Sequence, residues 1–160
     1  MLETKFAKFS AVALRLVLGW MFFYAGITEV VNPEWSAAGY LNTAKTFSGF
    51  YQWLASPAML PITNFVNEWG LTLVGASLIL GLFVRLGSFV GAGMMLLYYL
   101  PILDFPYPNT HSYIVDEHII YVAAFLLLAA LRAGRVVGLD KKFANSSWAA
   151  KCPKTVNFLS

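Results

Sequence analysis

Asp116, Glu117 and His118 stand in a row where a long apolar segment begins. Imidazole exchanges protons near neutral pH, and removal from water raises the pKa of a carboxyl group toward the same range. Two further carboxylates, Glu29 and Glu68, lie toward the ends of two other apolar segments. If these segments cross one bilayer, four acids and a histidine gather near one of its faces. Such a group could relay protons, so His118, Glu117 and Asp116 are the candidate catalytic residues.

Uncharged polar side chains accompany these groups. On two segments a hydroxyl follows a carboxylate by four residues: Thr72 follows Glu68, and Tyr121 follows Glu117. Polar stripes on membrane helices are expected to face the interior of the bundle. Tyrosine and histidine can hydrogen-bond the carbonyl oxygens of a quinone, which makes quinone the expected ligand. The sequence therefore predicts a pocket that opens outward, with a ligand-binding set of Glu29, Glu68, Tyr24, Tyr121 and Thr72.

Plainer interpretations compete with this one. Acids at the ends of spans can simply mark the interface, and Glu117 with His118 could be a buried ion pair. A metal is not predicted, because three adjacent residues on a regular helix point about 100° apart and cannot all reach one ion. Only His118 with Glu29 and Glu68 from neighbouring helices could share an ion. Haem is not predicted either, because His111 lies on the same side only seven residues before His118.

The composition places these residues in a membrane protein. Of the 160 residues, 59% are hydrophobic and 12% are charged, whereas a soluble domain carries about 25% charged residues. So few charges would leave large apolar patches exposed to water, which argues against a soluble protein. The single cysteine, Cys152, excludes a disulfide relay within the chain and a metal site built on thiolates.

Four apolar segments approach the length of about 20 residues that a transmembrane helix needs. The expected spans are residues 11–31, 61–84, 86–103 and 114–132. All lysines and arginines except Lys45 then fall on the side that holds both termini, and the positive-inside rule assigns that side to the cytoplasm. The expected fold is an all-α integral membrane protein: a four-helix transmembrane bundle forming one domain over residues 1–160, with residues 133–160 as a cytoplasmic tail.

Residues 33–60 lie between the first two spans and are too polar to cross. Helical spacing relates positions that are mostly aromatic or apolar: Tyr40, Ala44, Phe47, Tyr51 and Leu54. This pattern predicts an amphipathic helix in the outer interface, a depth that aromatic rings favour. The segment could be a simple anchor, or a lid over the acidic cluster. Glycines on the second and third spans, among them Gly75 and Gly91, are expected to allow close approach of helices.

Three stretches resemble the DoxX/DoxD family of small four-helix membrane proteins. They are RLVLGWMFFYAG (Arg15–Gly26), GASLILGLFVRL (Gly75–Leu86) and GRVVGLD (Gly134–Asp140), so the resemblance extends from about Arg15 to Asp140. The aromatic segment and the Asp116-Glu117-His118 row look closer to the DoxD branch, similar to the membrane subunit of thiosulfate:quinone oxidoreductase. The resemblance implies a prokaryotic cytoplasmic membrane, quinone as electron acceptor, and a partner subunit that carries the sulfur chemistry.

The expected function is a quinone-interacting membrane subunit of an oxidoreductase, with proton-coupled electron transfer at the outward pocket. One alternative is a non-catalytic membrane anchor or assembly subunit of a redox complex. Another is a small-solute transporter, which four short spans accommodate poorly without oligomerisation. The expected partners are lipid, quinone, and either other subunits or further copies of the chain, with no nucleic acid. The sequence leaves open whether the chain is itself an enzyme.

Overall fold

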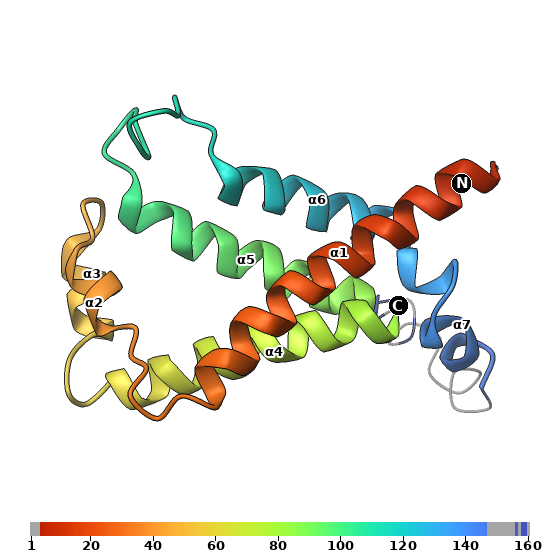
Figure 1. Cartoon of the computed structure of the whole chain (residues 1–160), viewed down its shortest axis with the longest axis horizontal. Coiled ribbons are helices and arrows are strands. Elements are labelled where there is room, and N and C mark those ends of the chain that lie inside the picture. The colour runs from red at the N-terminus through yellow and green to blue at the C-terminus, as the bar shows by residue number, and fades with distance from the viewer. Residues whose placement is uncertain (1–3, 147–155, 157, 160) are drawn as a thin grey trace.

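The long apolar runs form helices whose ends are set by capping side chains. The computed structural model describes residues 4–146, 156, 158 and 159 (Figure 1). Over these residues it is helical and has no strand, which confirms the all-α prediction. The elements are α1 (Lys5–Val30), α2 (Ala38–Asn42), α3 (Ser48–Leu54), α4 (Leu60–Leu80), α5 (Val84–Ile102), α6 (Glu117–Leu131), the 3-10 helix η1 (Ala133–Arg135) and α7 (Leu139–Ala144). Cys152 lies outside the described residues.

Capping displaces two helix starts from the expected span limits. α1 already begins at Lys5, because the hydroxyl of Thr4 accepts a hydrogen bond of 3.1 Å from an amide of the first turn. α6 begins only at Glu117, three residues later than expected. Its cap is Asp116, whose carboxylate accepts hydrogen bonds from two of the first amides of the helix, at 3.0 and 3.4 Å.

The surface of the long helices is apolar. α1 and α5 are long and apolar enough to cross a membrane, and α6 is an apolar helix of 15 residues. Large apolar side chains are exposed on all four long helices, among them Val17, Trp20, Phe65, Leu73, Leu96 and Ile120. In water this surface would be a broad apolar patch, whereas the acyl chains of a bilayer match it.

The four long helices pack mainly as two pairs, α1 on α4 and α5 on α6 (Figure 1). Glycine brings the first pair together: a Cβ at Gly26 would lie 2.4 Å from the nitrogen of Thr72, and one at Gly75 would lie 2.2 Å from that of Phe23. Gly91 of α5 lies against an aromatic ring of α6. The predicted close approach at Gly75 and Gly91 is therefore confirmed, by the kind of packing that holds helices together in lipid.

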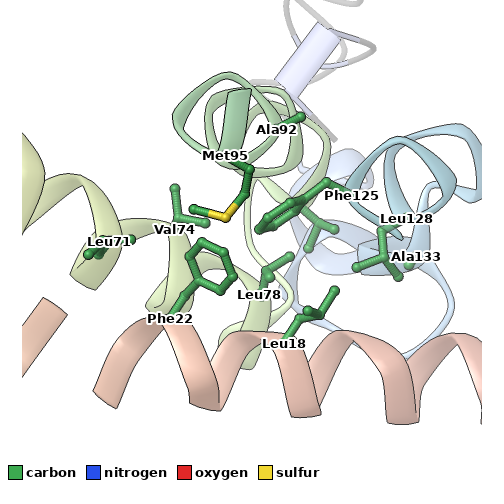
Figure 2. Packing of buried hydrophobic residues seen from close by; sticks show 11 residues of the cluster. Leu18, Phe22, Leu71, Val74, Leu78, Ala92, Met95, Phe125, Leu128 and Ala133 are labelled. Atoms are coloured by element: carbon green, nitrogen blue, oxygen red, sulfur yellow. The ribbon is translucent and has the colours of Figure 1, made fainter. Parts of the chain in front are cut away.

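An apolar core joins the two pairs (Figure 2). Phe22 of α1, Met95 of α5 and Phe125 of α6 converge on Val74 and Leu78 of α4. The rings of Phe22 and Phe125 meet edge to face, with centroids 4.9 Å apart and planes at 81°, a favoured arrangement for aromatic pairs. Toward the end of the bundle that carries α2 and α3, the two pairs separate (Figure 1). We call this the outer end, and the end with the N-terminus and α7 the inner end.

A buried carboxylate closes the inner end. The first amides of a helix have no partner within the helix, and Asp140 of α7 supplies acceptors for two amides at the start of α5. Its two oxygens accept hydrogen bonds from Phe83 N at 2.7 Å and from Val84 N at 3.1 Å. Asp140 is fully buried. Burial raises the pKa of its carboxyl group, and the two amides together with the guanidinium groups of Arg135 and Arg15 oppose that shift.

Close backbone contacts complete this arrangement. The amide of Asp140 donates to the carbonyl of Gly81 over 2.8 Å. A Cβ at Gly134 would lie 2.1 Å from the Asp140 carboxylate, so only glycine fits there. Arg15 of α1 is buried and donates from Nη1 to the Ala133 carbonyl at 3.0 Å. We call Arg15, Gly81, Gly134 and Asp140 the inner clasp. It joins all three stretches in which the family resemblance was found.

At the outer end, the segment between α1 and α4 caps the other end of α5. Pro101 lacks an N–H group, so the Leu97 carbonyl loses its normal helical donor, and the hydroxyl of Tyr51 donates to it over 2.9 Å. The amide of Lys45 donates to the Pro101 carbonyl at 2.8 Å, and the hydroxyl of Thr46 donates to the Leu103 carbonyl. We call residues 38–54 the outer cap.

The single amphipathic helix expected in this segment is not observed. The outer cap consists of two short helices, α2 and α3, separated by residues 43–47. Phe47, which the expected spacing placed on the same face as Tyr51, is 65% exposed and adopts a left-handed backbone with φ of 53°. The reason lies in Lys45 and Thr46, since a continuous helix would use the Lys45 amide internally instead of offering it to α5. Tyr51, by contrast, is buried.

We expect the Asp140→Ala variant to lower the free energy of unfolding by about 2 kcal/mol or more, because two buried amides lose their acceptor at about 1–3 kcal/mol each. The measurement is unfolding by sodium dodecyl sulfate in mixed micelles. Asp104→Ala is the matched control, because the Asp104 side chain is 71% exposed and forms only a surface ion pair with Lys45. Equal unfolding curves for the two variants would contradict the role assigned to Asp140.

The hydrogen bond from Tyr51 is expected to matter only because of Pro101. Tyr51→Phe should destabilise the fold by about 1 kcal/mol, since the Leu97 carbonyl loses its donor. In a Pro101→Ala background the new amide can donate to Leu97, so the same substitution should cost much less. The coupling is measured as a double-mutant cycle in the same unfolding assay. Independent, additive effects of the two substitutions would show that Tyr51 does not compensate for the proline.

Candidate functional site

A cavity of about 450 Å³ lies at the outer end, where the two helix pairs separate. This volume is within the range of small-molecule sites, about 300–1,000 Å³. All four long helices and residues 35–40 contribute to its lining. We call it the outer cavity; its ionisable and polar residues on the long helices are Glu29 of α1, Asn67 of α4, Tyr98 of α5, and Glu117 and His118 of α6.

One wall of the outer cavity is an aspartate–histidine pair. Oδ2 of Asp116 lies 2.7 Å from Nδ1 of His118, and Oδ1 accepts the His118 amide at 3.0 Å. Asp116 is only 3% exposed, whereas His118 is partly exposed and borders the cavity. A carboxylate on one ring nitrogen fixes the orientation of the imidazole. The other nitrogen, Nε2, takes no part in this contact.

The expectation that Asp116, Glu117 and His118 diverge was wrong. Their ligand-type atoms all lie within 4.8 Å of one another. The 100° argument assumed a regular helix, but Asp116 precedes α6 in an extended conformation, with φ of −125° and ψ of −169°, and folds back over the first turn. The shortest contact in the group is the one between Asp116 and His118, so the carboxylate acts on the imidazole.

Another part of the lining is a hydrogen-bonded chain of three side chains from three helices. The amide nitrogen of Asn67 donates to Oε2 of Glu29 at 2.8 Å, and the Tyr98 hydroxyl donates to the amide oxygen of Asn67. The ring of Tyr98 stands perpendicular to that of His118, with centroids 6.4 Å apart. The polar chain from Glu29 therefore ends beside the imidazole, and α1, α4, α5 and α6 are linked around the cavity.

Tyr40 closes the cavity on the side of the outer cap. Its hydroxyl donates to the backbone carbonyl of Tyr98. Burial, more than the neighbouring Tyr51 and Asp116, raises the pKa of Tyr40 to about 12. The hydroxyl therefore keeps its proton at neutral pH and remains a donor.

The structure places some of the predicted site residues elsewhere. Tyr24 is 58% exposed beside Trp20 on the surface of α1, and Tyr121 packs edge-on against Phe22 of the core. Thr72 is buried where α1 crosses α4, and its hydroxyl donates to the carbonyl of Glu68 at 2.8 Å. Tyr24, Tyr121, Thr72 and Glu68 do not line the outer cavity; Glu29, Glu117 and His118 do, with Asp116 behind the histidine.

Sequence reasoning missed Asn67 and Tyr98, and it named Tyr40 only as part of the interfacial segment, not as a site residue. On α4 the prediction followed Glu68 and Thr72, which are spaced by four, whereas the residue that borders the cavity is Asn67, three residues after Asn64. Residues three and four apart both lie on one helix face, so the spacing could not decide between Asn67 and Glu68. Tyr98 stands in a segment without charges, and no pattern in the sequence distinguished it from the neighbouring Tyr99.

The sequence model of the DoxX family matches residues 10–102, which is more than half of the chain. The match begins within α1 and runs to the end of α5, so it includes Glu29, Asn67 and Tyr98, and it ends before the Asp116–His118 pair and Asp140. Among the curated proteins and the solved structures, none matches this chain. Because the family match extends over most of the bundle, from α1 to α5, the chain belongs to the membrane-associated DoxX family.

Proposed function

We propose that α1, α4, α5 and α6 span a prokaryotic cytoplasmic membrane, with both termini in the cytoplasm and the outer cavity at the opposite face. The arrangement in Figure 1 supports this, because the N-terminus, the α4–α5 turn and α7 lie together at the inner end. The described basic residues of that end are Lys5, Lys8, Arg15, Arg85, Arg132, Arg135, Lys141 and Lys142. Among the described residues, several acidic side chains and a single lysine, Lys45, lie toward the outer end. The positive-inside rule favours this orientation.

The function that the outer cavity supports best is binding of a quinone and its proton-coupled reduction. The observation that carries this proposal is the pairing of Asp116 with His118 in the wall of a ligand-sized cavity. Reduction of a quinone to a quinol consumes two electrons and two protons. An imidazole held by a carboxylate can donate a proton from Nε2 to a quinone oxygen and be reprotonated. Glu29 and Glu117, which border the same cavity, are the groups that can supply the next proton.

The remainder of the lining suits a flat ring. Trp35, Leu71 and Ile102 give the cavity apolar walls, and apolar walls with a few convergent polar groups are typical of small-molecule sites. The electrons are proposed to come from a redox subunit that binds this chain, so the chain acts as the quinone-binding membrane subunit of an oxidoreductase complex. The resemblance to the DoxD branch supports a sulfur compound as the original electron donor.

A second function, that of a non-catalytic anchor subunit, is favoured by a different observation. The three stretches that resemble the family meet in the inner clasp, which only holds helix ends together. Arg15 and Asp140 are buried there, and neither borders the outer cavity. An anchor needs the clasp and the helix crossings and has no need of His118.

Quinone binding to the purified chain separates the two functions. We expect tetramethylbenzoquinone to bind in detergent and to quench the fluorescence of Trp35, which lines the cavity. His118→Ala should weaken binding about tenfold, or about 1.4 kcal/mol, through loss of one hydrogen bond. His111→Ala is the control, because His111 is exposed in the loop after α5. Equal affinities of the two variants would remove His118 from the site, and no binding to the wild type would leave the anchor function.

A further inference from the structure

A second cavity, of about 270 Å³, lies under the outer cap between α4 and α5. Its lining is almost wholly apolar. α3 provides the roof with Leu54, α4 provides Val66, and α5 provides Met94 and Leu97. Val66 is 59% exposed and Leu97 is 48% exposed on the surface of the bundle. We call it the apolar cavity, and its exposed lining faces the apolar interior of a bilayer.

The apolar cavity adjoins the outer cavity. Ala37, Tyr40, Asn67 and Tyr98 line both. Two hydrogen bonds join three of these shared residues, from the Tyr40 hydroxyl to the Tyr98 carbonyl and from the Tyr98 hydroxyl to Asn67. A polar space bordered by Glu29 and His118 thus shares part of its lining with an apolar space.

Charge restricts what can occupy both spaces at once. The carboxylate and imidazole side chains that border the outer cavity from the long helices are Glu29, Glu117 and His118, and among the described residues that line the two cavities there is no lysine or arginine. A phospholipid would bring a phosphate next to two carboxylates, which is unfavourable. A neutral ring with a hydrocarbon chain meets no such repulsion. Met59 and Met94 in the apolar cavity have flexible side chains that adapt to an irregular chain.

We propose that the apolar cavity holds the hydrocarbon chain of the molecule whose ring occupies the outer cavity. The inference rests on the proposed function and makes the ligand a membrane quinone with an alkyl or isoprenoid tail. The tail enters from the bilayer between α4 and α5, past Val66 and Leu97. The outer cap then serves as the fixed roof of the tail site, anchored to α5 through Tyr51, rather than as a mobile gate.

The test compares two quinones that differ only in the tail: trimethylbenzoquinone, and dimethyldecylbenzoquinone, in which a decyl chain replaces one methyl group. We expect the wild-type chain to bind the decyl compound at least tenfold more tightly. Val66→Trp fills the apolar cavity from its exposed edge and should reduce this ratio to below threefold, with the affinity for trimethylbenzoquinone unchanged. Val17→Trp is the matched control, because Val17 is 68% exposed on α1 and lines neither cavity.

The outcomes separate the two proposals. If trimethylbenzoquinone does not bind to the wild type, the proposed function fails, whatever the role of the apolar cavity. If it binds, but the decyl chain adds nothing or Val66→Trp keeps the tenfold ratio, the tail site is wrong. If Val66→Trp does not fold, Leu97→Trp fills the same cavity from α5 and decides by the same ratio. Phosphatidylglycerol that displaces the decyl compound but not trimethylbenzoquinone would assign the cavity to lipid and overturn the proposal.

Discussion

Both ends of α5 depend on hydrogen bonds from distant parts of the chain, and the remainder of the bundle is arranged around this requirement. In a membrane, an unpaired backbone group costs several kcal/mol, because no water is present to replace the missing partner. Asp140 supplies the acceptors at the start of α5, and Tyr51, Thr46 and Lys45 supply the donors at its end. Each set of hydrogen bonds fixes a neighbouring segment, α7 at the start of α5 and the outer cap at its end.

The position of α5 in turn determines the candidate site. Tyr98 stands one turn before the end of this helix, and it contacts α2 through its carbonyl, α4 through its hydroxyl and α6 through its ring. A shift of α5 along its axis would break all three contacts together. The polar lining of the outer cavity is therefore held by the same capping interactions that satisfy the backbone of α5.

The four long helices were predictable because each is encoded locally. Length, hydropathy and the asymmetry of lysine and arginine mark the segments, and Gly75 and Gly91 mark close crossings. The helix class and the family membership are confirmed, whereas the membrane topology remains a proposal. Boundaries failed where side chains bind backbone groups: the carboxylate of Asp116 accepts the first amides of α6, and the hydroxyl of Thr46 donates to the Leu103 carbonyl. The first contact is local and the second joins residues far apart in sequence, and hydrophobic periodicity carries no information about either.

The candidate site was predicted only in part, again because sequence patterns do not show which side chains contact one another. Glu29, Glu117 and His118 could be found because charges in apolar segments are rare and costly. Asn67 and Tyr98 could not, because an uncharged polar residue on a membrane helix can face the bundle or a neighbouring carbonyl equally well. Tyr121 and Thr72 are also polar, but they were predicted in the site and lie outside it. Tyr121 packs against Phe22, and Thr72 donates to the backbone carbonyl of Glu68.

The carboxylate of Asp116 makes two kinds of contact, one with each of its oxygens. One oxygen binds the first amides of α6, and the other binds the ring of His118. The positive end of the helix dipole favours the first contact. By linkage, whatever displaces the imidazole ring also alters the stability of the first turn of α6. The geometry of the cavity wall is thus coupled to the order of a helix end.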